Sequence, residues 1–234
     1  MRSALPCIDA GRYFMTPHDL HPMPEPCDPT LVAALSQVDT STLGHWRLWG
    51  LCDPALRPLA PGMKACGTIV TLALPGPDGA LLHEVLSQVR AGDVLVIDRL
   101  GDTRHSAVGG VVAAAAALRG LAAIVVDGPV ADLAEILAAG LPVWARGTSQ
   151  RTTRRLGLGG RVNAPVSVGG VVARPGDLAL CDGDGVVFLS PAEAARDIEM
   201  AQYAATREAF IREGLAKGIA LNDLLSPPAL AGSR

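Results

Sequence analysis

The hydrophobic pattern divides the chain into a proline-rich start and a longer body in which helices and strands alternate. Residues 1–29 contain six prolines, which remove backbone donors and prevent long regular elements, so we interpret them as an arm. Apolar residues at helical spacing over 30–38 predict a helix that begins at Asp28 or Thr30. Residues 226–234 contain two prolines and a glycine and predict a flexible tail. One domain over residues 30–225 remains.

The middle of the chain alternates between continuous apolar runs and helical segments. Uncharged apolar runs of this length are typical of strands buried on both faces of a sheet. The predicted strands are 66–74, 94–98, 121–126 and 141–145, and the predicted helices are 81–89, 109–119 and 129–139. This order predicts a βαβαβ unit with a parallel sheet.

The periodicity changes after Gly147. Turns expected at 169–170, 174–177 and 182–185 separate β-rich runs and predict antiparallel hairpins. Ser190, Pro191 and Glu193 then form the pattern of a capping box, which predicts a long helix ending near 214 or 218. The expected fold class is therefore α/β, with a parallel section, an antiparallel section and a long C-terminal helix.

Composition narrows the classes of protein that fit. The chain has 234 residues, of which 49% are hydrophobic, enough for one large buried core. A net charge of -3 and few aromatic residues (three Trp, two Tyr, three Phe) argue against a nucleic-acid-binding protein. No apolar run is long enough to span a membrane, and the start lacks the apolar core of a secretory signal, so the cytoplasm is the expected compartment. Five scattered cysteines without a CxxC pair predict reduced thiols.

Several sequence blocks, taken together, resemble the RraA-like / 4-hydroxy-4-methyl-2-oxoglutarate aldolase family. They are 53–62 (DPALRPLAPG), 92–98 (GDVLVID), 127–132 (DGPVAD) with 140–147 (GLPVWARG), and 175–177 with 184–187. The resemblance implies a swivelling β/β/α fold, assembled as ring-shaped homotrimers or hexamers with active sites at subunit interfaces. It also implies a divalent-metal lyase that cleaves 4-hydroxy-2-oxo acids to pyruvate and decarboxylates oxaloacetate.

The resemblance fails at the residues that carry this chemistry. The family signature is an acid, 20 intervening residues, and then Arg-Asp; the matching positions here are Gly110, Ala131 and Asp132. A methyl group cannot replace an arginine that stabilises a developing enolate, so ordinary aldolase turnover should be severely weakened. Asp132 alone is a poor site for Mg²⁺ or Mn²⁺, although such ions keep several waters and need only one or two carboxylates.

Two local features suggest what remains of a site. Glycines and valines at the start of a predicted helix leave backbone amides free for an acid group of a substrate (Gly109, Gly110, Val111, Val112, beside Ala131). Arg104 and His105, near Asp102, follow the strand that ends at Asp98 and are candidate replacement cationic or acid–base groups. The alternative is a solvated loop in which Asp102 caps the local backbone.

Glu208 on the last helix matches a family glutamate that reaches the metal's water shell from a neighbouring subunit. The alternative is an exposed helical glutamate within reach of Arg212 at i+4. The arm holds zinc-type ligands at a spacing that matches no standard site, so irregular packing is the competing interpretation (Cys7, His18, His21, Cys27). A basic stretch is either a solvated loop or a contact for phosphate or a partner (Arg146, Arg151, Arg154, Arg155).

Two classes of function stay open. The first is an enzyme on a small oxo- or hydroxy-carboxylate or related carbonyl metabolite, with the pocket refitted for altered lyase, isomerase or cyclising chemistry, as in biosynthetic tailoring. The second is a non-catalytic regulator, similar to family members that inhibit an RNA-degrading enzyme through protein contact. A residual metal-dependent aldolase or decarboxylase is a third reading.

Overall fold

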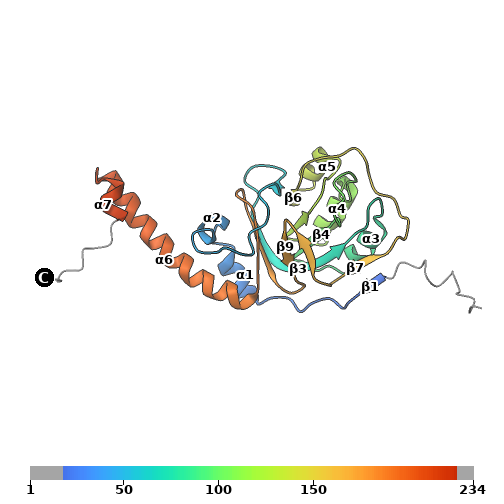
Figure 1. The fold of residues 1–234 in the computed structure, drawn as a ribbon, viewed down its shortest axis with the longest axis horizontal. Helices are drawn as coiled ribbons and strands as arrows, with labels where there is room; N and C mark the ends of the chain where they lie inside the picture. The colour runs from blue at the N-terminus through green and yellow to red at the C-terminus, as the bar shows by residue number, and fades with distance from the viewer. Residues whose placement is uncertain (1–17, 226–234) are drawn as a thin grey trace, which may run out of the picture.

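The structure is a computed structural model in which residues 18–225 are described. Its centre is a sheet of nine strands with the path β1-β7-β3-β4-β5-β6-β2, while β10 and β11 join it through β3 (Figure 1). A separate pair, β8 and β9, forms a hairpin. The predicted α/β fold with parallel and antiparallel sections is confirmed.

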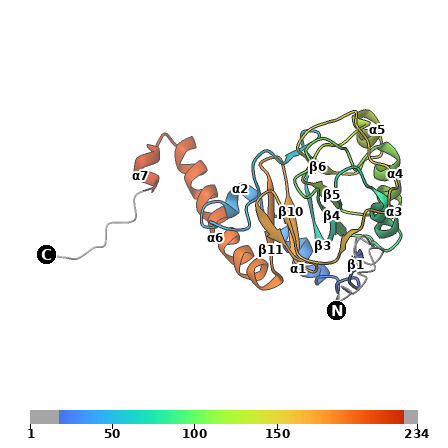
Figure 2. The same cartoon turned by 45° about the vertical axis from the view of Figure 1, so that its right-hand side comes forward.

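The parallel section contains the predicted βαβαβ unit and a further helix and strand. β3 (Ala65–Ala73), β4 (Asp93–Asp98), β5 (Ala123–Val126) and β6 (Val143–Ala145) pair in parallel in this order. The connecting helices α3 (Ala80–Leu86), α4 (Gly110–Leu118) and α5 (Leu133–Ala138) lie together on one face of the sheet (Figures 1 and 2). The C-terminal ends of β4 and β5 therefore open toward the start of α4 and α5, where ligand sites of parallel sheets usually lie.

The antiparallel section follows the parallel one in the chain. The hairpins are β8 (Val166–Val168) with β9 (Val171–Ala173) and β10 (Leu178–Cys181) with β11 (Val186–Leu189). β7 (Gly160–Val162) pairs with the end of β3, and β1 (His18–Leu20) runs beside it. The short β2 (Arg57–Pro58) closes the other edge against β6.

Buried apolar residues form three groups that correspond to these layers. The largest packs between α3–α5 and the sheet, and includes Leu82, Ile97 and Ile136. A second lies on the opposite face around Trp144, under β8 and β9. A third joins β10 and β11 to α1 and the start of α6. The small alanines of α4 lie in the first group, where they allow close packing on the sheet.

The long C-terminal helix α6 (Pro191–Ala216) begins with the predicted capping box, since Ser190 and Glu193 bond each other's backbone. Its start packs on α1 (Pro29–Leu35), and Arg47, after α2 (Thr40–Leu43), forms a buried ion pair with Asp197. The rest extends away from the sheet and ends beside α7 (Leu221–Leu225), as Figures 1 and 2 show. None of the described helices has both the length and the apolarity needed to cross a membrane.

Most element boundaries match the predictions within a few residues, with one informative exception. The helix predicted over 129–139 starts only at Leu133. The amides of Val130 and Ala131 instead bond the carbonyls of Gly147 and Val108, which holds this segment extended. Asp132 then turns the chain with a left-handed φ of 53°. Of the predicted arm and tail, residues 1–17 and 226–234 lie outside the described part of the chain.

Candidate functional site

A cavity of about 200 Å³ lies at the N-terminus of α4. It brings together five of the predicted substrate- or metal-binding residues, which come from α4 and from the turn before α5 (Gly109, Val111, Val112, Ala131, Asp132). The other lining residues are Gly79, His83, Ser106, Ala107 and four residues of one loop, 152–155. The amides of Val111 and Val112 form no hydrogen bond with any residue in 18–225, as expected for the first turn of a helix.

Gly110 corrects one prediction. We expected its backbone amide to be free for an acid group of a substrate, but Gly110 is buried and turned toward α5. A Cβ atom there would lie 2.0 Å from Oε2 of Glu135, and the Gly110 amide donates to Oδ2 of Asp132 at 3.2 Å. The carboxylates of Asp132 and Glu135 therefore occupy the space beside Gly110, and the free amides left in this first turn are those of Val111 and Val112.

Asp102 and His105, two of the candidate acid–base residues, form a hydrogen-bonded pair. Nδ1 of His105 lies 2.7 Å from Oδ2 of Asp102. Burial raises the pKa of Asp102, but bonds from the amides of Arg104 and His105 and from the His105 ring outweigh it and hold that pKa below its usual value. An ionised Asp102 favours the tautomer with the proton on Nδ1, which leaves Nε2 as the basic nitrogen. The alternative interpretation, in which Asp102 caps the local backbone, is correct, because its Oδ1 accepts from the amides of Arg104 and His105.

His105 lines a second hollow of about 380 Å³, together with Pro77, Leu156 and three residues of the loop 151–154. Thr152 and Arg154 line both this hollow and the cavity at α4. The imidazole and the free amides of α4 thus face neighbouring parts of one surface, joined by the same loop.

Sequence reasoning missed Arg99, which lies next to this pair. Its side chain is 0% exposed, and one nitrogen lies 3.6 Å from Oδ2 of Asp102 while donating to the carbonyl of Gly76. Nε and Nη1 have no partner within the described part of the chain. The only sequence signal for Arg99 is its position: it is a charged residue that directly follows Asp98, the last residue of a buried strand.

Arg104 is not brought into the site. Its side chain is exposed and lines neither hollow, and its carbonyl accepts a hydrogen bond from Ser149. Sequence reasoning also missed His83 of α3 and the turn residue Asp78. Asp78 is buried and accepts from the amides of Leu156 and Leu158, which fixes the loop above the site.

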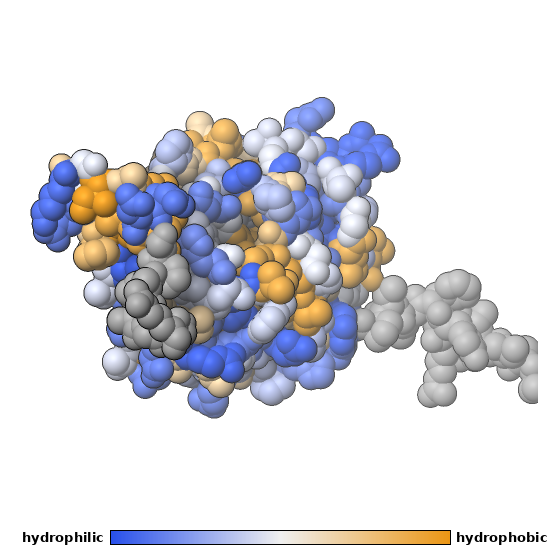
Figure 3. All heavy atoms as spheres, turned by 60° about the vertical axis from the view of Figure 1, so that its left-hand side comes forward, coloured by the Kyte–Doolittle hydropathy of each residue, from blue (hydrophilic) through white to orange (hydrophobic). Residues whose placement is uncertain are grey.

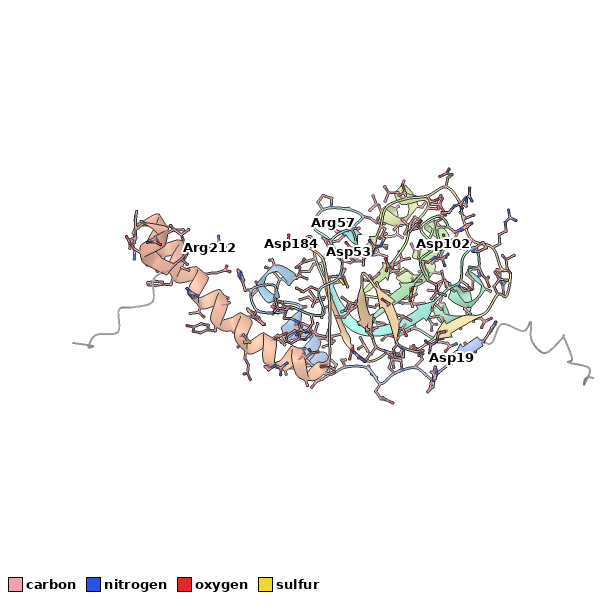
Figure 4. The ribbon with its side chains drawn as sticks, in the orientation of Figure 1. Asp19, Asp53, Arg57, Asp102, Asp184 and Arg212 are labelled. Carbon is pink, nitrogen blue, oxygen red and sulfur yellow. The ribbon has the colours of Figure 1, made fainter. Side chains whose placement is uncertain are left out.

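Arg146, the first residue of the basic stretch, has a structural role. It binds Asp127 at the end of β5 and Asp53 at 3.0 Å, and these bonds raise its pKa. Figure 4 shows Asp53 and Asp102 at separate places on the molecule. The other three arginines of the stretch form no ion pair with any residue in 18–225.

The arm residues do not form a zinc site in the part of the chain that is described. His21 pairs with Asp19 at 2.8 Å, and the Cys27 thiol donates to the carbonyl of Gly176. Burial raises the pKa of Cys27, so its thiol stays protonated. Across residues 18–225, no group of three or more His, Cys, Asp or Glu side chains is placed to hold a metal ion. Cys7 lies outside the described residues.

Sequence comparison identifies the family of this chain. A sequence model described as RraA-like, Aldolase/RraA, matches residues 39–188. The chain belongs to the RraA-like family. This range includes every element that lines the two hollows, but not α6.

Named relatives agree with this assignment. A protein of Halalkalibacterium halodurans named "Putative 4-hydroxy-4-methyl-2-oxoglutarate aldolase" is 31% identical over 147 residues, 63% of this chain and 70% of that protein. The crystal structure of Streptomyces coelicolor RraAS2, described as an unusual member of the RNase ES inhibitor RraA protein family, matches with a TM-score of 0.73 and 30% identity, covering 80% of this chain and 98% of that one. The RNA-processing inhibitor RraA from Thermus thermophilus matches with a TM-score of 0.59 and 30% identity, covering 65% and 92%.

The divalent metal that the RraA-like aldolases imply does not fit the residues found here. Gly110 and Ala131 offer no ligand atoms, and an oxygen of Asp132 already accepts from the Gly110 amide. Asp132 lines the cavity, but no second acidic residue in 18–225 lines it. A hard cation usually needs one or two free carboxylates along with its waters. This donor set is therefore too poor to define a metal centre.

Glu208 is far from the cavity within one subunit. It lies on the extended part of α6, 3.6 Å from Arg212, which Figure 4 shows at the opposite end of the molecule from Asp102. The i+4 ion pair expected in the alternative interpretation is present. Any role of Glu208 at the site therefore needs a neighbouring subunit.

Proposed function

We propose that this RraA-like chain is an enzyme that acts on a small oxo- or hydroxy-carboxylate, with His105 as its acid–base group. The observation that carries the proposal is the Asp102–His105 pair, because it fixes one tautomer of an imidazole that lines a hollow next to a helix N-terminus. A paired carboxylate and imidazole beside an anion-binding surface is a common arrangement for proton transfer.

The substrate carboxylate would lie in the cavity at α4, against the free amides of Val111 and Val112. Nε2 of His105 would then take a proton from the carbon next to the substrate carbonyl and return it after rearrangement. The electron pair left by the proton moves onto the carbonyl oxygen as an enolate. Proton transfer of this kind contributes about 10²–10⁴-fold to a rate.

The test is exchange of the methyl protons of pyruvate with deuterated water, followed by NMR. We expect the purified protein to accelerate the exchange over buffer, and His105→Asn to lose about 10²-fold or more of that acceleration. His45→Asn is the matched control, because His45 is exposed beside α6 and away from the site. No acceleration by the natural protein, or full activity in His105→Asn, would contradict the proposal.

A second assay separates the altered site from a residual aldolase. Oxaloacetate and 4-hydroxy-4-methyl-2-oxoglutarate are incubated with the protein in Mg²⁺ or Mn²⁺ and in a chelator. We expect turnover, where present, to persist in the chelator. Turnover that the chelator abolishes would favour the metal-dependent family reaction instead.

We also propose that the chain assembles as a homotrimer or hexamer. Every residue of α4 is apolar, and Val111 and Leu118 on its outer side are 81% and 90% exposed. A surface helix that is apolar on all sides is usually covered by a partner. Leu118→Glu is expected to lower the mass measured by light scattering to that of a monomer or smaller assembly; an unchanged mass would contradict this interface.

A non-catalytic regulator is the second candidate. The same exposed α4 face favours it, as do apolar side chains on α6 and on the 45–51 loop, which reach the surface in patches (Leu48, Trp49, Tyr203, Phe210). Figure 3 shows apolar patches among polar side chains on one face of the molecule. If the deuterium exchange assay fails while the protein folds, binding of a protein partner becomes the preferred function.

A further inference from the structure

The cavity at α4 is expected to receive a carboxylate, yet the position that faces it from the turn before α5 has no charge. Ala131 is 7% exposed and contributes only a methyl group. The cavity also contains the carboxylate of Asp132, which repels an anion. A second carboxylate needs a compensating cation there, because burying unpaired like charges is costly.

The cations that line the cavity come from one loop. Arg154 and Arg155 both line it, together with Ala131, the start of α4 and His83 of α3. Arg154 alone of the two arginines also lines the hollow that holds His105. Its guanidinium forms no ion pair and no hydrogen bond with any residue in 18–225, so its charge is available to a ligand.

The backbone of this loop is fixed at Arg154. Its amide donates to the carbonyl of Pro77 at 2.8 Å, and its carbonyl accepts from the amide of Gly79 at 2.8 Å. Beyond it, the amides of Leu156 and Leu158 donate to the buried carboxylate of Asp78 at 3.0 and 2.6 Å. A side chain on a backbone fixed by hydrogen bonds binds a ligand better than one on a free loop, because less conformational entropy is lost on binding.

We propose that Arg154 is the anion-binding cation of this site and supplies the charge that Ala131 lacks. The proposal rests on the carboxylate site argued above. Arg154 binds the substrate carboxylate from the loop side, while the amides of Val111 and Val112 bind it from the helix side. A planar guanidinium suits this role because it meets both oxygens of a carboxylate at once.

The position of Arg154 also limits the substrate. Because one guanidinium lines both hollows, the carboxylate that it holds lies next to the place where His105 acts. The reacting carbon is then close to the carboxylate, as in short acids that carry the carbonyl or hydroxyl at the neighbouring carbon. Long-chain acids with a distant carbonyl do not meet this condition.

The test measures binding without turnover, with oxalate as the probe, by titration calorimetry on the full chain. We expect oxalate to bind the natural protein, Arg154→Gln to weaken it at least tenfold, and Arg154→Lys to retain more of the affinity than Arg154→Gln. Arg196→Gln is the control with the same change of charge, since Arg196 is exposed on α6. Thermal unfolding of each variant shows whether the fold is kept.

Two results would overturn the proposal: no binding of oxalate to the natural protein, or equal binding to Arg154→Gln. The outcome is independent of catalysis. Loss of oxalate binding in Arg154→Gln together with no proton exchange in the pyruvate assay would support the anion site and reject the enzyme. Unchanged binding together with His105-dependent exchange would reject Arg154 and leave the enzyme standing.

Discussion

The side chain of Glu135 fills the place that a side chain at residue 110 would need. A Cβ atom at Gly110 would lie 2.0 Å from Oε2 and 2.5 Å from Cβ of Glu135. The first turns of α4 and α5 are therefore close because residue 110 is glycine. An acidic side chain introduced at residue 110 would therefore have to displace Glu135 and, with it, part of α5.

Gly110→Asp is expected to lower the free energy of unfolding by about 1–3 kcal/mol, because α5 must move to admit the new side chain. Urea unfolding followed by circular dichroism measures this. Gly183→Asp is the control, since a Cβ at Gly183 meets no atom within 4 Å. If Gly110→Asp had the same free energy of unfolding as the natural protein, α5 would be able to move at little cost. That result would contradict the packing argument.

Asp102→Asn is expected to move the proton of His105 from Nδ1 to Nε2, because an amide nitrogen beside Nδ1 cannot accept its hydrogen bond. Nitrogen NMR of the labelled imidazole reports the tautomer directly and needs no substrate. The variant should also lose proton-exchange activity. A natural tautomer in Asp102→Asn would mean that another group orients the ring.

Asp78→Asn is expected to lower the free energy of unfolding by about 1–3 kcal/mol and to release the loop that carries Arg154. Burial raises the pKa of Asp78, but hydrogen bonds from the amides of Leu156, Ala80, Leu158 and Gly157 outweigh it and hold that pKa below the usual value of 3.8. A depressed pKa means that the ionised group stabilises the fold above pH 3.8 and that this contribution is lost as the pH falls through the lowered value.

The difference in stability between the natural protein and Asp78→Asn should therefore be full at pH 7 and shrink only below about pH 4. Urea unfolding across this range measures it, with Asp184→Asn in an exposed turn as the matched control. A difference that is the same at pH 7 and at pH 3 would show that the charge of Asp78 is not what holds the loop.

Arg99→Met is expected to leave the free energy of unfolding unchanged or to raise it. Burial lowers the pKa of Arg99, and two of its nitrogens lack partners among residues 18–225, so the charge is costly where it lies. Arg90→Met should lower the free energy of unfolding, because it leaves the buried carboxylate of Asp93 without its ion pair. A loss of more than about 2 kcal/mol in Arg99→Met would mean that the guanidinium stabilises the fold after all.

The fold was largely predictable from the sequence, because buried strands such as β4 (Asp93–Asp98) and capped helices such as α6, which Ser190 caps, are determined by residues close together in the chain. The site was only partly predictable. Asp102 and His105 are three residues apart and could be paired from local sequence, whereas Arg154 reaches the cavity through contacts with a turn more than 70 residues earlier. The close approach of Glu135 to Gly110 likewise depends on the position of α5 over α4.

β3 is hydrogen-bonded along its whole length: its first residues pair with β10, its last with β7, and β4 runs along its other side. The nine residues of β3 thus belong both to the antiparallel section, which supports α6, and to the parallel section, which carries the cavity. Residues in the exposed loops beyond the ends of this strand can change without breaking the hydrogen bonds of the strand itself. Such freedom is one physical route by which an old architecture acquires new chemistry.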